Sequence, residues 1–315
     1  MRLANRSVHV LTAIVLAVFA LSSVACGASV VVDARPTPAF TPHHFPDNAA
    51  VKFLVIGDWG SGDRNQKLIA KRMDEKAAAD GSTFTLAVGD NFYPRGVSSV
   101  TDPQWKTSFR DIYTGKSIQG PFYVALGNHD YMKEPQAEVD YSGIDPRWKM
   151  PERYYTFSQS SSTGVTVDFF ALDTTPVNDH DKEYINKEVV WLEEQLKRST
   201  AKWKIVYGHH PVYSNGKHGD NKYMIQYFKP LFEKYHVDLY LCGHDHDMQV
   251  IKPENGVHYI LSGGASDHRD VKWRENTIYA QTNLGFVWCA VSDTMIEAQV
   301  LDRDGKIGYA YDITK

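Results

Sequence analysis

The sequence predicts an α/β (α+β) fold in which two packed β-sheets are flanked by helices in a single domain. Apolar, β-branched runs alternate with helical patterns between residues 51 and 242, as expected for strands that pack against helices. The last third of the chain is strand-rich without obvious helices, which indicates a terminal meander. With 315 residues and 43% hydrophobic content, the chain can bury a substantial core.

The predicted elements follow in order along the chain. Strands are expected at 51–56, 84–88, 122–126, 165–172, 204–207, 239–242, 257–261, 286–291, 295–301 and 307–311. Helical patterns cover about 65–80 and 182–198. The second pattern has an apolar stripe at helical spacing, which indicates a core-facing helix rather than a partner-binding one: Ile185, Val189, Leu192 and Leu196. The tetrapeptide Asp302-Arg303-Asp304-Gly305 predicts a hairpin turn between the last two strands.

Residues 1–28 have the composition of a secretory signal peptide. Two arginines precede an apolar stretch at 10–21, and small residues surround Cys26. A retained membrane anchor is the alternative, because no Asp, Glu, Lys or Arg occurs between residues 7 and 32. The strongly apolar part is nevertheless shorter than the ~20 residues that a membrane span needs. A lipoprotein acylated at Cys26 is a weaker alternative, because Ser23 replaces the expected bulky aliphatic residue.

The rest of the chain is predicted to be an extended leader followed by one domain. Residues 29–48 contain four prolines, which lie amid polar residues between Val32 and Asn48, whereas residues 49–315 hold all the predicted elements. The formal charge of -4 is mild and the charges are interspersed, so no nucleic-acid partner is expected. Three cysteines are too few for a disulfide scaffold. Cys242 and Cys289 lie inside apolar runs and are predicted to be buried free thiols.

Five predicted strands are each followed by a glycine and a metal-type ligand. The segments are Gly57-Asp58-Trp59-Gly60, Gly89-Asp90-Asn91-Phe92-Tyr93, Gly127-Asn128-His129-Asp130, Gly208-His209-His210-Pro211 and Gly243-His244-Asp245-His246. Each glycine lets the backbone turn sharply where the strand ends. Because neighbouring strands deliver their loops to one edge of a sheet, we expect these ligands to converge.

The donor types indicate two metal ions of different character. Asp58, Asp90 and Tyr93 are hard oxygen donors that suit a trivalent ion such as Fe(III). The neutral donors suit divalent Fe, Zn or Mn, and they are Asn128, His209, His244 and His246. The two histidines of the last segment can serve the same ion or different ions. Each segment alone is explained by a turn, a loop or packing, but all five in this order predict a binuclear metal site.

The five segments resemble those of the purple acid phosphatase branch of the calcineurin-like metallophosphoesterases, most of all the small, mammalian-type, tartrate-resistant enzymes. The similarity runs from about Val51 to the C-terminus. Tyr93 distinguishes this branch from protein Ser/Thr phosphatases and most phosphodiesterases. The resemblance implies an αββα sandwich and a hydrolase, an acid phosphatase that cleaves phosphate monoesters through a binuclear Fe(III)–M(II) centre and a metal-activated hydroxide.

The resemblance also implies a role for each site residue. Asp58, Tyr93 and His246 would hold the Fe(III). Asn128, His209 and His244 would hold the divalent ion, which is Fe(II), Zn(II) or Mn(II), and Asp90 would bridge the two. His129 would contact phosphate and protonate the leaving group, and His218 matches a second active-site histidine.

Three regions qualify this comparison. The family usually has Tyr where this chain has His210, so local packing or substrate access is expected to differ. The stretch from Asp173 to Trp191 looks shorter than the mammalian regulatory loop, so control by cleavage is not expected. The Gly-rich segment 262–269 is predicted to be a plain loop, with a position at the site's border as the alternative.

The expected substrates are small phosphate esters, with phosphoproteins or nucleotides as further candidates. We expect a monomer in the secretory pathway, outside the cell or in a lysosome-like or vacuolar compartment, and membrane association only if the N-terminal segment is retained. A nucleotidase or phosphodiesterase is the alternative enzyme. A non-catalytic scaffold, such as the glideosome-associated anchor of apicomplexan parasites, is the alternative class, which the seven filled ligand positions disfavour.

Overall fold

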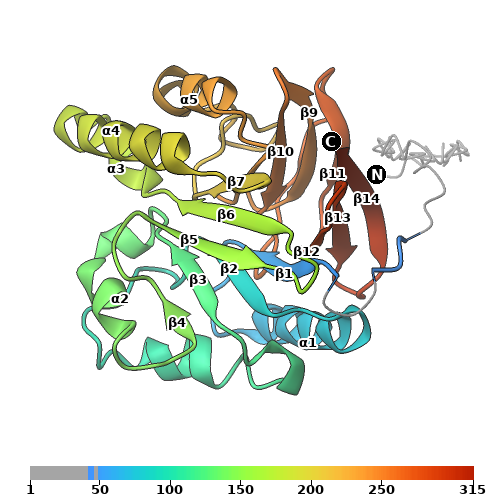
Figure 1. Ribbon diagram of the computed structural model, residues 1–315. Helices are drawn as coiled ribbons and strands as arrows, with labels where there is room; N and C mark the ends of the chain where they lie inside the picture. The colour runs from blue at the N-terminus through green and yellow to red at the C-terminus, as the bar shows by residue number, and fades with distance from the viewer. Residues whose placement is uncertain (1–41, 46–48) are drawn as a thin grey trace, which may run out of the picture. The chain divides into compact units, whose positions relative to one another are not determined.

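Two seven-stranded sheets form the centre of the computed structural model, which describes residues 42–45 and 49–315 (Figure 1). The strand order of the first sheet is β14 (Ile307–Thr314), β13 (Met295–Asp302), β12 (Gly285–Val291), β1 (Val51–Ile56), β2 (Phe84–Val88), β3 (Phe122–Ala125) and β4 (Trp148–Lys149). The order of the second is β11 (Thr277–Gln281), β9 (Met248–Glu254), β10 (Val257–Ser262), β8 (Leu239–Cys242), β7 (Trp203–Tyr207), β6 (Thr166–Ala171) and β5 (Tyr155–Ser160).

Each sheet has a parallel centre. Strands β1 to β4 are parallel in the first sheet, and β6, β7, β8 and β10 are parallel in the second. Antiparallel strands complete both sheets, with β12 next to β1, β5 next to β6 and β9 next to β10. The carboxyl ends of each parallel set therefore meet at one edge of its sheet.

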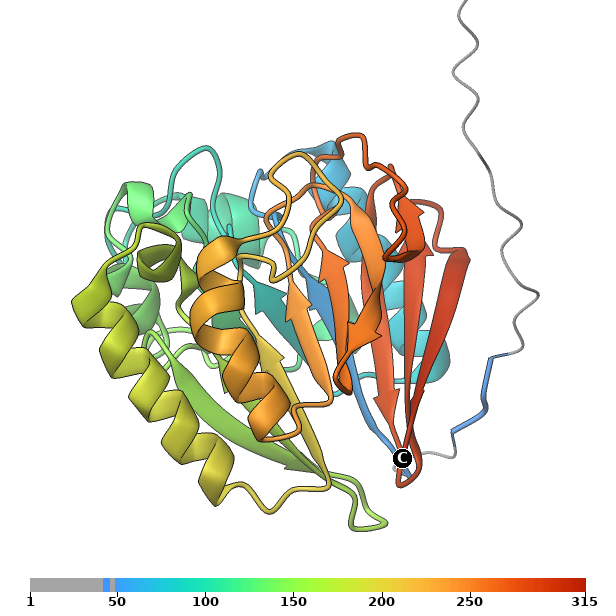
Figure 2. The same cartoon turned by 90° about the horizontal axis from the view of Figure 1, so that it is seen from above.

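Helices cover the outer faces of both sheets (Figures 1 and 2). On the side of the first sheet are α1 (Arg64–Asp80), the π-helix η1 (Trp105–Arg110), the 3-10 turns η2 (Lys116–Ile118) and η3 (Asp130–Met132), and α2 (Gln136–Tyr141). On the side of the second are α3 (Thr174–Asn178), α4 (Lys182–Arg198), the π-helix η4 (Met224–Phe228) and α5 (Lys229–Lys234). This arrangement confirms the predicted fold class.

The two long helices begin and end where local chemistry requires it. The Asp63 carboxylate accepts the backbone N–H groups of Asn65 and Gln66, which caps α1, and the helix ends at Gly81 with φ 83°. Asp181 caps α4 in the same way, and Lys197 and Arg198 lie in its last turn, where cations interact favourably with the helix dipole. Both helices start within a residue of the predicted position.

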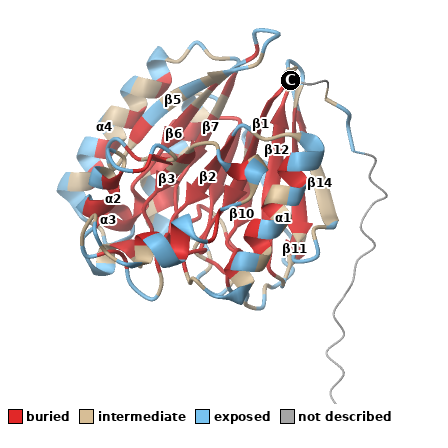
Figure 3. Ribbon diagram, turned by 90° about the horizontal axis from the view of Figure 1, so that it is seen from below, coloured by how far each residue is buried: buried red, intermediate tan, exposed pale blue. Residues whose placement is uncertain are grey.

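The core lies between the sheets and beneath the helices. Phe169 of β6 lies 5.4 Å from both Phe53 of β1 and Phe84 of β2, which joins the inner faces of the two sheets. A second apolar cluster lies between the second sheet and α4 and α5, and includes Leu192 and Phe232. The central strands are buried, whereas the edge strands β5 and β14 are only partly buried and the outward faces of α1 and α4 are exposed (Figure 3).

Several short elements were not predicted. Strand β4 has two residues and β5 is an edge strand with polar, partly exposed side chains, so neither has a clear apolar pattern. The expectation of no helices in the last third is wrong for η4 and α5, which are too short to show helical periodicity. The predicted turn at 302–305 is confirmed, because the Gly305 N–H donates to the Asp302 carbonyl.

Three further predictions concern the N-terminal segments, membrane-spanning helices and the cysteines. The predicted signal peptide 1–28 and most of the leader 29–48 lie outside the described residues. Within the described part of the chain, no helix combines the length and apolarity that a membrane crossing requires. Cys242 and Cys289 are buried free thiols, as predicted.

Candidate metal centre

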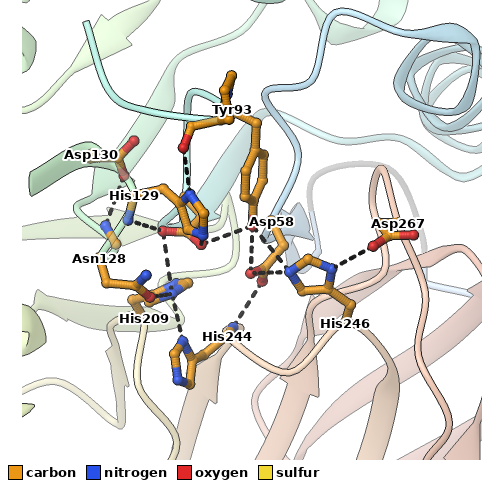
Figure 4. A network of polar contacts seen from close by, with 12 residues as sticks. Asp58, Tyr93, Asn128, His129, Asp130, His209, His244, His246 and Asp267 are labelled. Carbon is orange, nitrogen blue, oxygen red and sulfur yellow. Dashed lines mark hydrogen bonds and ion pairs between the residues drawn. The ribbon is translucent and has the colours of Figure 1, made fainter. Parts of the chain in front are cut away.

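Seven predicted ligands come together at the carboxyl ends of the parallel strands. Asp58 follows β1, Asp90 and Tyr93 follow β2, and Asn128 follows β3, while His209 follows β7 and His244 and His246 follow β8. Figure 4 shows the side chains of Asp58, Tyr93, Asn128, His209, His244 and His246 pointing toward one region. Loops from both sheets therefore contribute to one site.

Close approach of the loops explains the glycines. A Cβ on Gly89, whose φ is 93°, would lie 2.6 Å from His209 Nδ1, and one on Gly127 would lie 2.2 Å from Asp90 Oδ1. Asp58, Asp90 and His244 have φ values of 58°, 52° and 75°, which non-glycine residues rarely adopt. Such strained residues are frequent at functional sites.

One half of the site is rich in oxygen donors. The Tyr93 hydroxyl lies 3.0 Å from Asp58 Oδ1 and 2.8 Å from Asp90 Oδ2, and its single proton can be donated to only one of them. His246 Nε2 lies 3.2 Å from the Tyr93 hydroxyl and 3.4 Å from Asp58 Oδ1. Burial and the charges of Asp58 and Asp90 hold the pKa of Tyr93 well above its ordinary value. A tyrosinate therefore requires a strong positive charge at this position.

The other half is rich in histidine. His209 Nδ1 lies 3.0 Å from the Val88 carbonyl oxygen and donates a hydrogen bond to it. In the neutral ring the lone pair is therefore on Nε2. This Nε2 lies 3.2 Å from Asn128 Oδ1, 3.2 Å from His244 Nδ1 and 3.4 Å from Asp90 Oδ1. Burial and the nearby His209 and His218 lower the pKa of His244 to about 3, so its ring is neutral.

The donor set fits bound cations. Lone pairs of His209, Asn128 and Asp90 face one another, and this arrangement is repulsive unless a proton or a metal ion lies between them. One ligand atom each of Asp58, Asp90 and His209 lie within 4.8 Å of one another. Such spacings suit atoms that share an ion at about 2.0–2.2 Å.

Carboxylates outside this set hold it in place. Asp130 accepts the backbone N–H groups of Asn91 at 2.9 Å, Phe92 at 3.1 Å and Gly127 at 2.8 Å, and so joins the second and third segments. Asp267, on the loop after β10, lies 3.1 Å from His246 Nδ1 (Figure 4). Such partners fix the orientation of a metal-binding histidine.

The prediction of a plain loop at 262–269 is therefore wrong. Besides the Asp267 contact, the Ser266 hydroxyl donates to the Asp58 carbonyl at 2.7 Å. The signal in the sequence was a Gly-rich segment after a predicted strand. In the structure this strand, β10, is parallel to β8, so its loop reaches the same edge of the sheet as the loop with His244 and His246.

The two candidate catalytic histidines lie on opposite sides of the site. The backbone N–H of His129 donates to Asp90 Oδ1 at 2.9 Å. The His129 ring lies 4.6 Å from the Tyr93 ring, and its Nδ1 lies 2.7 Å from the Pro94 carbonyl oxygen. The His218 ring lies 4.2 Å from that of His244, and its Nδ1 lies 2.8 Å from Asp245 Oδ1.

A cavity of about 390 Å³ opens beside the histidine-rich half. Its lining is polar and aromatic: Asn178, Pro211, His218, Gly219, Asp220, Asn221, Lys222, Tyr223 and His244. His210 is not among these residues. It is fully buried, with Nδ1 2.9 Å from Thr174 Oγ1 and its ring 4.5 Å from that of His244. The His210 side chain therefore affects the packing next to the His244 ring.

Comparisons with known proteins agree with this geometry. Residues 51–248 match the family described as calcineurin-like phosphoesterase. Human tartrate-resistant acid phosphatase type 5 is 33% identical over 238 residues, which cover 69% of this chain and 73% of that protein. Purple acid phosphatase 3 of Arabidopsis thaliana is 35% identical over 240 residues, which cover 70% of this chain and 64% of that protein.

Solved structures show the same fold. GAP50, the anchor in the inner membrane complex of Plasmodium, superposes with a TM-score of 0.79 at 26% identity, covering 84% of this chain and 89% of that one. Purple acid phosphatase PPD1 from yellow lupin superposes with a TM-score of 0.61 at 14% identity, covering 84% and 54%. The chain belongs to the purple acid phosphatases within the calcineurin-like phosphoesterase family.

Proposed function

We propose that the protein is an acid phosphatase of the phosphoric monoester hydrolase class and acts through a binuclear Fe(III)–M(II) centre. The observation that carries this proposal is the convergence of Tyr93 and four further donors around two buried aspartates. The alternative of a non-catalytic scaffold gains support from the fold similarity to GAP50. The complete donor set favours an enzyme.

We assign the donors by the half of the site in which they lie. Asp58, Tyr93 and His246 would hold Fe(III), because their donor atoms lie within 3.4 Å of one another. Asn128, His209 and His244 would hold Fe(II), Zn(II) or Mn(II), because His209 Nε2 lies 3.2 Å from both other donors. Asp90 would bridge, because its Oδ2 faces Tyr93 and its Oδ1 faces His209.

When bound, such a metal pair supplies Lewis-acid stabilisation of the phosphoryl oxygens and lowers the pKa of water. The chain itself supplies the proton for the leaving group. With Nδ1 held by the Pro94 carbonyl, His129 has Nε2 available for transfer, and this atom lies 3.9 Å from Asp90 Oδ2. Proton donation from such a position contributes about 10²–10⁴-fold to the rate.

His218 would position the substrate on the other side. Asp245 also accepts the Ser214 hydroxyl, and its contact with His218 Nδ1 orients the ring so that Nε2 is free for the cavity. The cavity would hold the leaving group of a small phosphate ester. Lys222 Nζ lies 4.7 Å from the Tyr223 ring centre, and this cationic and aromatic pair makes a nucleotidase the second candidate function.

We also propose that the protein is a secreted or lysosome-like monomer, with residues 1–28 removed as a signal peptide. The supporting observation is the basic, apolar and small-residue order of these residues. Sequencing the N-terminus of the mature protein tests this proposal. An intact Met1 would favour the membrane-anchored alternative.

The deciding experiment uses protein expressed from residue 30. Metal content and the visible spectrum are measured together with p-nitrophenyl phosphate hydrolysis from pH 4 to 8. Two metals including iron, a purple band and an acidic optimum are expected. Two metals without turnover would favour the scaffold, whereas iron binding without colour would contradict the Tyr93 assignment. A comparison of nucleoside phosphates with aryl phosphates then separates the two candidate enzymes.

A further inference from the structure

A second group of metal-type ligands lies outside the candidate centre. One ligand atom each of His43, Glu297 and Asp312 lie within 4.8 Å of one another. His43 Nε2 lies 3.0 Å from Asp312 Oδ2 and 4.0 Å from Glu297 Oε2. The group joins the described part of the leader, residues 42–45, to neighbouring strands β13 and β14 of the first sheet.

The two carboxylates of this group face each other across the strands. Glu297 and Asp312 are directly paired in the antiparallel register of β13 and β14. Like charges at directly opposite positions are destabilising. The Glu297 side chain is also fully buried, so its charge is costly without a cation next to it. Burial accordingly raises the pKa of the Glu297 carboxyl.

Lys76, which lies beyond Gln299 from Glu297, has other partners. Lys76 of α1 donates to Gln299 Oε1 and pairs with Asp80 at 2.9 Å, and Gln299 in turn donates to Glu297 Oε1. Glu297 therefore meets an amide rather than the lysine on that side. A cation bound on the side on which His43 lies would offset the charge of Glu297.

The leader holds the imidazole in position from both directions. The backbone N–H of His43 donates to Glu297 Oε2 at 3.0 Å, and this contact places the imidazole ring over the carboxylate pair. Two residues later, the Phe45 carbonyl accepts from Lys52 Nζ at 3.2 Å, and the Phe45 ring packs against the core. The ligand geometry thus rests on backbone contacts as well as on the imidazole itself.

We propose that His43, Glu297 and Asp312 bind a divalent transition ion such as Zn²⁺ and thereby fasten the leader to the β13–β14 hairpin. One imidazole and two carboxylates suit Zn²⁺, whereas Ca²⁺ requires six to eight oxygen ligands. Spacings of 3.0 and 4.0 Å suit atoms bound to one ion at about 2.0–2.2 Å. The side chains of His43 and Asp312 are 46% and 37% exposed, so water can complete the coordination.

The site would stabilise the fold without taking part in catalysis. Its contacts join residues 254 and 269 positions apart in the sequence. An ion that binds only the folded state stabilises it, and this contribution grows with the logarithm of the free ion concentration. The proposal does not depend on the phosphatase assignment.

The test compares wild type, His43→Ala and His44→Ala, all expressed from residue 30 and loaded with excess Zn²⁺ before desalting. His44→Ala is the matched control, because it removes the adjacent histidine and leaves all three proposed ligands. Elemental analysis is expected to show one metal ion fewer per chain in His43→Ala than in the other two proteins. Zn²⁺ added to desalted protein should raise Tm by several degrees in wild type and by less in His43→Ala.

A third variant, Asp312→Asn, keeps the side-chain volume and should lose the same ion. Phosphatase activity should be unchanged in all three variants, which separates this site from the centre. Equal metal content in wild type and His43→Ala, with equal Tm responses to Zn²⁺, would overturn the proposal. A Tm difference that depends on pH but not on Zn²⁺ would also overturn it, because protonated His43 alone would then supply the charge.

Discussion

Two pairs of buried acidic residues lie near the carboxyl ends of the parallel strands but meet different surroundings. Asp58 and Asp90 follow β1 and β2, and Asp173 follows β6 and contacts Glu188 of α4. In the first pair, a phenol and imidazoles surround the carboxylates, and several lone pairs converge. That pair requires a cation.

The second pair retains a proton instead. Asp173 Oδ2 accepts the hydroxyls of Tyr131 at 2.5 Å and Tyr184 at 2.6 Å, and the Asp173 N–H donates to Glu188 Oε1 at 2.7 Å. Burial raises the pKa of Asp173 to about 6, and burial together with the Asp173 charge raises that of Glu188 well above its ordinary value. The neighbours of Asp173 are hydroxyl donors and a second carboxyl group. These surroundings favour a proton over a metal ion.

A strand followed by an aspartate is therefore not by itself a metal signal. Both pairs contain an aspartate that follows a strand. They differ in whether the neighbouring segments supply lone pairs, which bind a cation, or hydrogen-bond donors. Four predictions test this distinction, in order of decreasing effect.

The largest effect is expected from Asp90→Ala, which removes the carboxylate shared by both halves of the centre. Loss of metal should lower kcat/KM for p-nitrophenyl phosphate by about 10³-fold or more, since metal stabilisation contributes several kcal/mol. Elemental analysis should show at least one ion fewer per chain than in wild type. Asp173→Asn is the control from the other pair and should keep both ions. Full metal content in Asp90→Ala would show that the comparison is mistaken.

The variant His129→Ala tests whether the proton for the leaving group comes from a residue beside the first pair. We expect a loss of about 10²–10⁴-fold for alkyl phosphates with poor leaving groups. Activated aryl phosphates should lose much less, because their leaving groups need no proton. A leaving-group series measures this, and equal losses across the series would exclude His129 as the general acid.

Tyr93→Phe tests whether the first pair binds its cation with a tyrosinate. The visible charge-transfer band should disappear because the oxygen donor is lost, while both ions remain bound through the other ligands. We expect kcat to fall by about tenfold, roughly 1.4 kcal/mol of transition-state stabilisation. The absorption spectrum and metal content of the same sample check this, and a retained purple band would assign the colour to another ligand.

The smallest effect is expected from Glu188→Gln, and it concerns pH-dependent stability. Between about pH 4 and pH 6 the folded pair binds more protons than the unfolded chain, so the free energy of unfolding falls as pH rises. The amide removes part of this dependence, so wild type should lose about 1–2 kcal/mol more than the variant between pH 4.5 and 7.

Urea denaturation at both pH values measures that difference, in which the contribution of the metal centre is common to both proteins. Glu194→Gln changes a 58% exposed residue of the same helix and should leave the wild-type profile unchanged. Parallel profiles for wild type and Glu188→Gln would mean that the second pair is ionised in the folded protein.

Much of the fold was predictable because its signals are local. The apolar runs of β1, β2 and β3, the stripe on α4 and the glycine after each strand are properties of neighbouring residues, and the structure has them at the predicted positions. Convergence of the segments within each sheet followed from strand direction, whereas the packing of the two sheets brought the loops after β1, β2 and β3 next to those after β7 and β8. The short helices and polar edge strands were missed because they have too few apolar repeats to show a period.

The sequence by itself determined the strand ends, the turns and the set of donor residues, because these depend on contacts within a few positions of the chain. Only the tertiary structure decided which donors face one another. Asp267 next to His246, Asp130 beneath two loops, Tyr131 and Tyr184 on Asp173, and His43 over Glu297 and Asp312 all join segments that are far apart in the sequence. Whether a buried carboxylate carries a proton or attracts a cation depends on those neighbours, because burial penalises its charge and only nearby donors or positive charges offset that penalty.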